Sequence, residues 1–312
     1  MATYTKEQLA RYYEHIGFTP SEVPVDVTED ELNLWKLKQL TQIQYRHMER
    51  VPFESLYLHY TRHRTLSLDP QDLYDKVVNK GRGGYCMEIN QFFAVILRTA
   101  GFNIMTAGGR VLIAGVDGWN HQVTIVTIGN QKYLVDVAFG SGCSLSPVPL
   151  QDGIEFELVA PARGKLEYRA LTTHTNQDQR VWVYSFQEAP PAPWLPKYCF
   201  VEIEFFPADF AVMNQRTMAA PQSFFVQNVM CVRTVLGGPP EDPKPVATLI
   251  LFRNYLKRIS RGQEEVLATF KLEEERIAAL KEWFNIDISP AERNAIRGLP
   301  TELRASYNFE CP

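Results

Sequence analysis

A glycine-rich turn followed by a cysteine is the most informative feature of the sequence. Residues 82–88 read RGGYCME and lead into an apolar stretch with helical spacing, so Cys86 is predicted to lie in the first turn of a helix. Free backbone N–H groups at that position stabilise an anion such as a thiolate. A helix N-terminus stabilises such an anion by only about 0.3–1 kcal/mol, which is too little to keep a typical thiol mostly ionised at neutral pH. A neighbouring imidazolium can do much more, so the chemistry calls for a partner histidine.

His121 is the histidine that fits this role, because it opens a predicted strand over residues 121–128. A second strand over residues 133–137 carries Asp136, and a turn at Gly129-Asn130 predicts a hairpin that joins the two strands. With the turn there, residue 121 lies opposite about residue 138, close to Asp136. A carboxylate on the imidazole N–H fixes the tautomer and stabilises the charged form. Cys86, His121 and Asp136 are therefore predicted to form an activated-nucleophile triad.

Each of the three residues also has an ordinary structural interpretation. A single cysteine is usually a small buried apolar residue, and a histidine at the end of a strand is more often structural than catalytic. An aspartate in a strand is often a turn-facing or capping residue, although one inside an apolar strand needs a buried partner, because an unpaired buried charge is costly. The functional interpretation is favoured by the three residues together, with His121 and Asp136 on adjacent strands.

The elements that must position the triad follow a simple order along the chain. Residues 1 to about 100 read as mostly helical, with amphipathic spacing from Leu32 to Tyr45 and a helix over residues 69–79. Short β-rich runs follow from residue 102, and consecutive strands suggest an antiparallel sheet or barrel. The last third is mixed: a hairpin of 247–255 and 264–271 is expected around Arg261-Gly262, then a helix over residues 273–284. The glutamates at its start, 273–275, are expected to be a solvated first turn.

Composition excludes several classes of protein. The chain has 312 residues, of which 45% are hydrophobic and 22% charged, as is ordinary for a globular protein. Lys plus Arg number 32 against 36 Asp plus Glu, so the basic excess of a nucleic-acid binder is missing. The five cysteines form no closely spaced pair that would indicate a zinc site. No apolar run approaches the roughly 18 residues that span a bilayer. We expect a cytoplasmic protein with no metal, no nucleic-acid partner and no membrane partner, assumed to be a monomer.

Several motifs together resemble the arylamine N-acetyltransferase family. Residues 82–88 match its cysteine signature, and residues 51–56 (VPFESL) and 135–140 (VDVAFG) resemble two further family motifs. Residues 13–17 and 280–286 resemble its N-terminal and C-terminal motifs, although His15 replaces the usual arginine. The resemblance covers about residues 10–290 in the right order. The length of the chain suggests a eukaryotic member, such as a fungal one.

The resemblance implies an α+β fold in three parts, with the core shared by cysteine proteases and transglutaminases. A helical bundle (residues 1–101) would carry Cys86, a central antiparallel β-barrel (102–205) would carry His121 and Asp136, and an α/β lid (206–312) would follow. The implied reaction is ping-pong transfer of an acetyl or related short acyl group from an acyl-coenzyme A to an arylamine, arylhydroxylamine or hydrazine. Acetyl-CoA or another donor such as malonyl-CoA would be a co-substrate, and no cofactor would be bound permanently.

The resemblance also implies binding residues. Phe53, Val111 and Phe139 are expected to wall the arylamine site, since aromatic and β-branched side chains suit a flat apolar ring. Gly118 matches a family position near the coenzyme A pyrophosphate, although Asp117 beside it is an unusual neighbour for a phosphate.

Two alternatives remain open from the sequence. A cysteine hydrolase or transglutaminase-like enzyme would use Cys, His and Asp in the same chain order, although the papain motif does not fit the spacing here. A non-catalytic binding protein could also keep the fold, but proteins that descend from enzymes and have lost their activity commonly lack a member of the triad. The remaining cysteines, including Cys311, are expected to take no part in the reaction.

Overall fold

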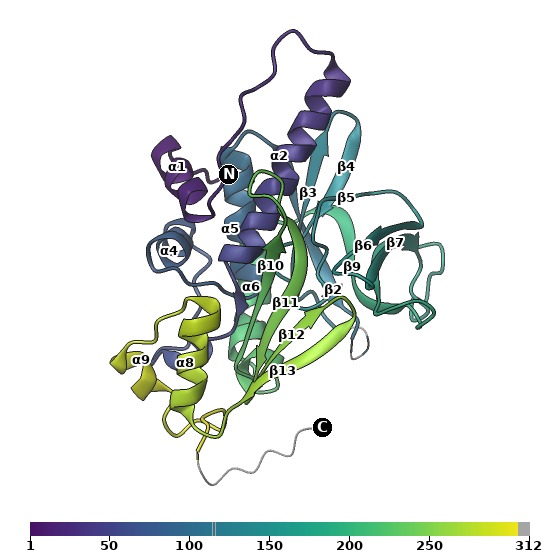
Figure 1. Ribbon diagram of the computed structural model, residues 1–312. Coiled ribbons are helices and arrows are strands. Elements are labelled where there is room, and N and C mark those ends of the chain that lie inside the picture. The colour runs from purple at the N-terminus through teal and green to yellow at the C-terminus, as the bar shows by residue number, and fades with distance from the viewer. Residues whose placement is uncertain (114, 116, 305–312) are drawn as a thin grey trace.

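The computed structural model describes residues 1–113, 115 and 117–304. Its N-terminal part is helical: α1 (Lys6–His15), α2 (Glu29–Arg50), α3 (Tyr57–Tyr60), α4 (Pro70–Tyr74), the π-helix η1 (Asp75–Asn79) and α5 (Cys86–Thr99), with the short strand β1 (Phe53–Glu54) between α2 and α3. Figure 1 draws these helices in purple and blue, beside both sheets. The expected helix over 69–79 is thus α4 running into η1. Cys311 lies outside the described residues.

Helix α5 forms the centre of the N-terminal part. Every residue from Cys86 to Leu97 is buried, including the polar residues Glu88, Asn90 and Gln91. Its aromatic residues Phe92 and Phe93 belong to the largest apolar cluster, which also takes in residues of α1, α2 and the first hairpin. The helix that carries Cys86 is therefore fixed by packing along most of its length.

The middle of the chain forms an antiparallel sheet of eight strands. In chain order these are β2 (Asn103–Val111), β3 (His121–Ile128), β4 (Gln131–Val135), β5 (Val148–Pro149), β6 (Ile154–Glu157), β7 (Arg163–Arg169), β8 (Val181–Gln187) and β9 (Leu195–Glu204). They pair in the order β5-β4-β3-β2-β9-β8-β7-β6. The sheet curls into a nearly closed barrel, drawn in teal in Figure 1. The predicted α+β architecture is confirmed.

The predicted hairpin of β3 and β4 is present with its expected register. Thr124 pairs with Val135 and Ile128 with Gln131 around the turn at Gly129-Asn130. Strand β4 ends at Val135, so Asp136 directly follows the strand rather than lying within it. Continuing this register places residue 121 opposite residue 138, as the sequence predicts.

The C-terminal part contains helices α6 (Pro207–Ala219) and α7 (Phe224–Gln227), then a second antiparallel sheet and helices α8 (Glu273–Phe284) and α9 (Pro290–Ala295). The sheet order is β1-β10-β11-β12-β13, with β10 (Met230–Gly237), β11 (Lys244–Phe252), β12 (Tyr255–Ser260) and β13 (Gln263–Thr269). Its first strand, β1, comes from the N-terminal part. The division of the chain at residues 101 and 205 stays a prediction.

Two expectations for this part of the chain are wrong. Residues 247–269 do not form a single hairpin, because the turn at 253–254 separates β11 from β12, and Arg261-Gly262 turns β12 into β13. The glutamates that begin α8 are not all solvated. Glu273 is buried and accepts hydrogen bonds from Tyr60 and Arg276. Sequence spacing could not reveal this, because Tyr60 comes from a distant helix.

Candidate active site

Cys86 is the first residue of α5, and close backbone contacts fix the turn that delivers it. The N–H of Glu54 donates to the carbonyl of Gly84 (2.9 Å), and the N–H of Gly84 donates to the carbonyl of Pro52 (3.3 Å). A Cβ atom on Gly83 would lie 1.7 Å from that Pro52 oxygen, so only glycine fits there. The glycines of the signature therefore allow the backbone of residues 52–54 to hydrogen-bond to the cysteine turn.

The imidazole of His121 lies between the cysteine and the aspartate. Nε2 of His121 is 2.7 Å from Oδ2 of Asp136, and the two side chains are 1% and 0% exposed. Sγ of Cys86 donates to the carbonyl oxygen of Asn120 at 3.7 Å, so the sulfur lies beside the residue that precedes His121. Gly109 pairs with His121 across the β2–β3 ladder, and a Cβ there would lie 3.0 Å from the carbonyl oxygen of Cys199 and in ordinary contact with His121. The structure therefore brings together the three residues that the sequence predicts.

The charges of this pair stabilise each other. Burial alone would lower the pKa of His121, but the Asp136 carboxylate and Cys86 outweigh it and raise the pKa to about 10. Burial likewise works to raise the pKa of Asp136, while the charge and hydrogen bond of His121 hold it below its ordinary value. An imidazolium beside a sulfur favours the ionised, nucleophilic form of a cysteine.

Asn90 is a site residue that the sequence reasoning missed. Its Nδ2 donates to Oδ1 of Asp136 (2.9 Å) and to the carbonyl of Gln122 (2.6 Å), and its Oδ1 accepts from the N–H of Val137 (3.0 Å). Asn90 lies four residues after Cys86, so both residues share a face of α5. That spacing was the available signal. One side chain thus ties the cysteine helix to β3 and to the segment that directly follows β4.

Aromatic rings surround the triad. The ring of Phe139 packs edge-on against His121 with centroids 5.2 Å apart, and the ring of Tyr198 lies 4.8 Å from His121. Phe53 packs against Gly140, and its ring meets Phe225 of α7 at 5.8 Å. The predicted residue Phe139 therefore contacts the triad, and Phe53 lies beside Gly140, the residue after it. Their contact with an arylamine stays a prediction. Tyr198 and Phe225 were missed, because both come from distant elements and carry no local motif.

The other two predicted binding residues, Val111 and Gly118, lie at the end of β2 and in the segment that leads into β3 and His121. Val111 ends β2, is half-buried, and donates its N–H to Oδ1 of Asn120 (2.9 Å). Gly118 is exposed, and its N–H donates to Oδ1 of Asp117 (2.7 Å). Asp117 also pairs with Arg216 of α6 at 3.0 Å. The acidic neighbour therefore engages the N–H of the residue that was expected to lie near the coenzyme A pyrophosphate.

Within residues 1–113, 115 and 117–304, no three His, Cys, Asp or Glu side chains gather so as to hold a metal ion. Over the same part of the chain, no helix has the length and apolar character needed to cross a membrane.

Comparison with known proteins agrees with this geometry. A family model described as N-acetyltransferase matches residues 36–293. N-malonyltransferase FDB2 of Gibberella moniliformis is 34% identical, over 96% of this chain and 93% of its own. The arylamine N-acetyltransferase structure from Nocardia farcinica superposes with a TM-score of 0.75 at 25% identity, covering 94% of each chain. The Mycobacterium marinum enzyme in complex with CoA gives 0.74 at 22% identity, covering 92% and 97%. The chain belongs to the arylamine N-acetyltransferase family.

Proposed function

We propose that this protein transfers an acyl group from an acyl-coenzyme A to the nitrogen of an arylamine, arylhydroxylamine or hydrazine. The observation that carries the proposal is the buried His121–Asp136 ion pair beside Cys86, whose sulfur lies 3.7 Å from the carbonyl oxygen of Asn120. Such a pair activates a thiol nucleophile without a metal or a redox group. The similarity to an N-malonyltransferase and to an arylamine N-acetyltransferase that was solved in complex with CoA supports an acyl-coenzyme A as the donor.

The reaction would proceed in two balanced half-reactions. In the first, Sγ of Cys86 attacks the thioester carbonyl, and the coenzyme A sulfur leaves with a proton from His121. In the second, the amine nitrogen attacks the acyl-cysteine carbonyl, its proton passes to His121, and Sγ leaves. Aromatic amines are weak bases that stay neutral near pH 7, so they need no strong base. Backbone N–H groups in the first turn of α5 are suited to stabilise the oxyanion.

The similarity to N-malonyltransferase FDB2 over nearly the whole chain favours malonyl as the group transferred, with acetyl as the second candidate. The acceptor site would be bounded by Phe53, Val111 and Phe139. Gly118 would lie near the coenzyme, with Asp117 moving aside from its N–H to admit a phosphate.

Intact-mass spectrometry tests the proposal directly. The protein is incubated separately with acetyl-, propionyl- and malonyl-CoA, and the mass gained is followed with and without an aromatic amine. We expect one acyl group on Cys86, discharged quickly by the amine and slowly by water, with malonyl added fastest. Cys86→Ser should gain none. Rapid discharge by water or cleavage of peptides would instead favour the hydrolase alternative.

A further inference from the structure

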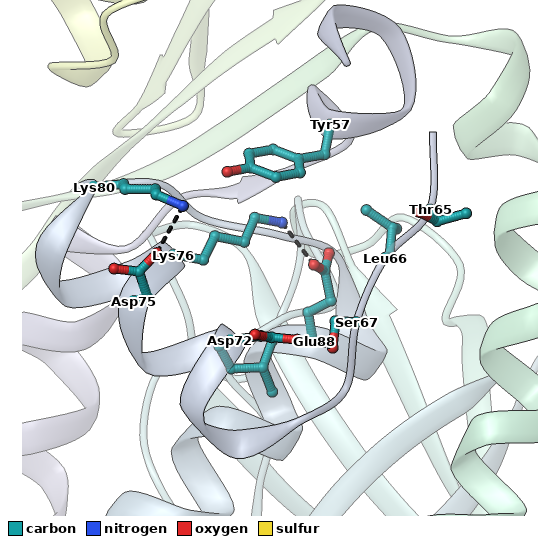
Figure 2. Close-up of a pocket in the computed structure, with 10 residues that line it drawn as sticks. Tyr57, Thr65, Leu66, Ser67, Asp72, Asp75, Lys76, Lys80 and Glu88 are labelled. Carbon is teal, nitrogen blue, oxygen red and sulfur yellow. Dashed lines mark hydrogen bonds and ion pairs between the residues drawn. The ribbon is translucent and has the colours of Figure 1, made fainter. Parts of the chain in front are cut away.

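A cavity of about 200 Å³ borders the first turn of α5, on the side where Glu88 points (Figure 2). Two ion pairs lie in its wall. Lys76 Nζ is 2.6 Å from Glu88 Oε1, and these side chains are only 7% and 2% exposed. Lys80 Nζ is also 2.6 Å from Asp75 Oδ2, but those side chains are 56% and 47% exposed. The same cavity therefore holds one buried and one solvated pair of similar geometry.

The buried carboxylate reaches back to the cysteine turn. While Oε1 of Glu88 accepts from Lys76, Oε2 accepts from the N–H of Tyr85 at 3.3 Å. Gly84 makes room for this, because a Cβ atom there would lie 2.6 Å from Oε2. Tyr85 is the residue immediately before Cys86, so Glu88 accepts a hydrogen bond from the backbone of the turn next to the sulfur.

Lys76 in turn fixes the carboxylate. It lies in the π-helix η1, a helix type that is often found at functional sites. Its ammonium lies 4.2 Å from the centroid of the Tyr57 ring, and the same ring lies 5.0 Å from the guanidinium of Arg82. A buried charge that loses its partner is strongly unfavourable, so Lys76 and Glu88 act as one neutral unit.

We propose that Glu88, held by Lys76, is a positioning residue for Cys86. By fixing the N–H of Tyr85 it holds the turn so that the sulfur faces His121 and the first N–H groups of α5 face the thioester carbonyl. This rests on the proposed acyl transfer, because acylation of Cys86 is the step it serves. A misplaced nucleophile costs up to about a hundredfold in rate.

Single-turnover acylation of Cys86 measures the effect, using the acyl-CoA that labels the wild-type protein. We expect Lys76→Met and Glu88→Gln each to slow acylation by about tenfold or more, with the KM for acyl-CoA within about twofold. The double variant Lys76→Met/Glu88→Gln removes both charges and keeps an oxygen for Tyr85, so it should recover most of the rate. Lys80→Met, which breaks only the exposed pair, is the matched control and should acylate like the wild type.

The pH profile separates positioning from a loss of folding. Burial raises the pKa of Glu88, Lys76 opposes this, and Glu54 adds a like charge. The other ionisable groups near the cavity are Tyr57, Asp72, Asp75, Lys80 and Tyr85. Without Lys76 the pKa of the Glu88 carboxyl should rise further, so the acylation rate of the Lys76→Met variant should rise with pH along a limb that the wild type lacks.

The outcomes are distinguishable. Wild-type rates for both single variants at every pH, an equal loss in Lys80→Met, or no recovery in the double variant would each overturn the positioning role. If Glu88→Gln fails to fold, as judged by circular dichroism, the pH profile of Lys76→Met and the rate of the double variant still decide. A wild-type protein that forms no acyl-cysteine would instead refute the proposed function.

Discussion

His121 and Asp136 form a buried ion pair across the end of the first hairpin, with 2.7 Å between Nε2 and Oδ2. Since the pair raises the pKa of His121 to about 10, the folded protein holds a proton that the unfolded chain releases above about pH 6.5. The free energy of unfolding should therefore fall as pH rises from about 6.5 to 10. Asp136 acts in the opposite direction: its lowered pKa adds stability near neutral pH that is lost in acid.

Urea unfolding between pH 6.5 and 9.5 checks the histidine contribution. The wild type should lose stability over this range more steeply than the double variant His121→Gln/Asp136→Asn, in which neither residue has a proton to release. Equal slopes for the two proteins would show that the histidine is not held protonated.

Cys86 should be alkylated by iodoacetamide faster than the other described cysteines near pH 6–7. Burial raises the pKa of the Cys143, Cys199 and Cys231 thiols, which keeps them protonated and unreactive. Peptide mass mapping over time gives each rate separately, and His121→Ala should slow the reaction of Cys86 alone. A Cys86 that reacts no faster than free cysteine would contradict the activated-nucleophile interpretation.

Removing the side chain of Asn90 should impair both stability and turnover. Asn90→Ala leaves the Val137 N–H and the Gln122 carbonyl without their partner, and each unsatisfied buried group costs about 1–3 kcal/mol. Acylation should also slow, because Asp136 loses a donor that orients it. Thermal unfolding and single-turnover kinetics measure the two effects. Gln91→Ala is the control, since the hydrogen bond of Gln91 goes to the Gln122 side chain.

Local signals in the sequence predicted the cysteine turn and the hairpin well. Glycines beside Cys86 and the turn at Gly129-Asn130 determine geometry over a few residues, so the positions of His121 and Asp136 follow from counting along the strands. Contacts between distant segments were not predictable in this way. Phe225 reaches Phe53 across 172 positions in the chain (225 − 53 = 172), and Glu273 is buried because it meets Tyr60.

Gly83→Ala should abolish acylation or folding. The added Cβ would lie 1.7 Å from the Pro52 carbonyl oxygen, so the turn would have to move away from β1. Gly81→Ala is the matched control two residues earlier. Its Cβ would meet nothing within 4 Å, but its φ of +62° disfavours alanine, at a cost of about 1–2 kcal/mol. Gly81→Ala should therefore fold with a modest loss in thermal stability and keep its acylation rate. An active Gly83→Ala protein would show that the turn tolerates displacement.

Phe225 should influence the amine rather than the acyl donor. Its ring packs edge-on against both Phe53 and Tyr85, at 5.8 and 5.0 Å, so it faces the wall predicted to hold an arylamine. Phe225→Leu keeps the site apolar but removes ring packing worth about 0.5–1.5 kcal/mol. We expect the KM for arylamines to rise about two- to tenfold, while acylation of Cys86 stays within about twofold. Phe224→Leu changes a neighbouring ring that is 51% exposed and should leave both constants unchanged. Equal effects of the two substitutions on the amine KM would place the acceptor elsewhere.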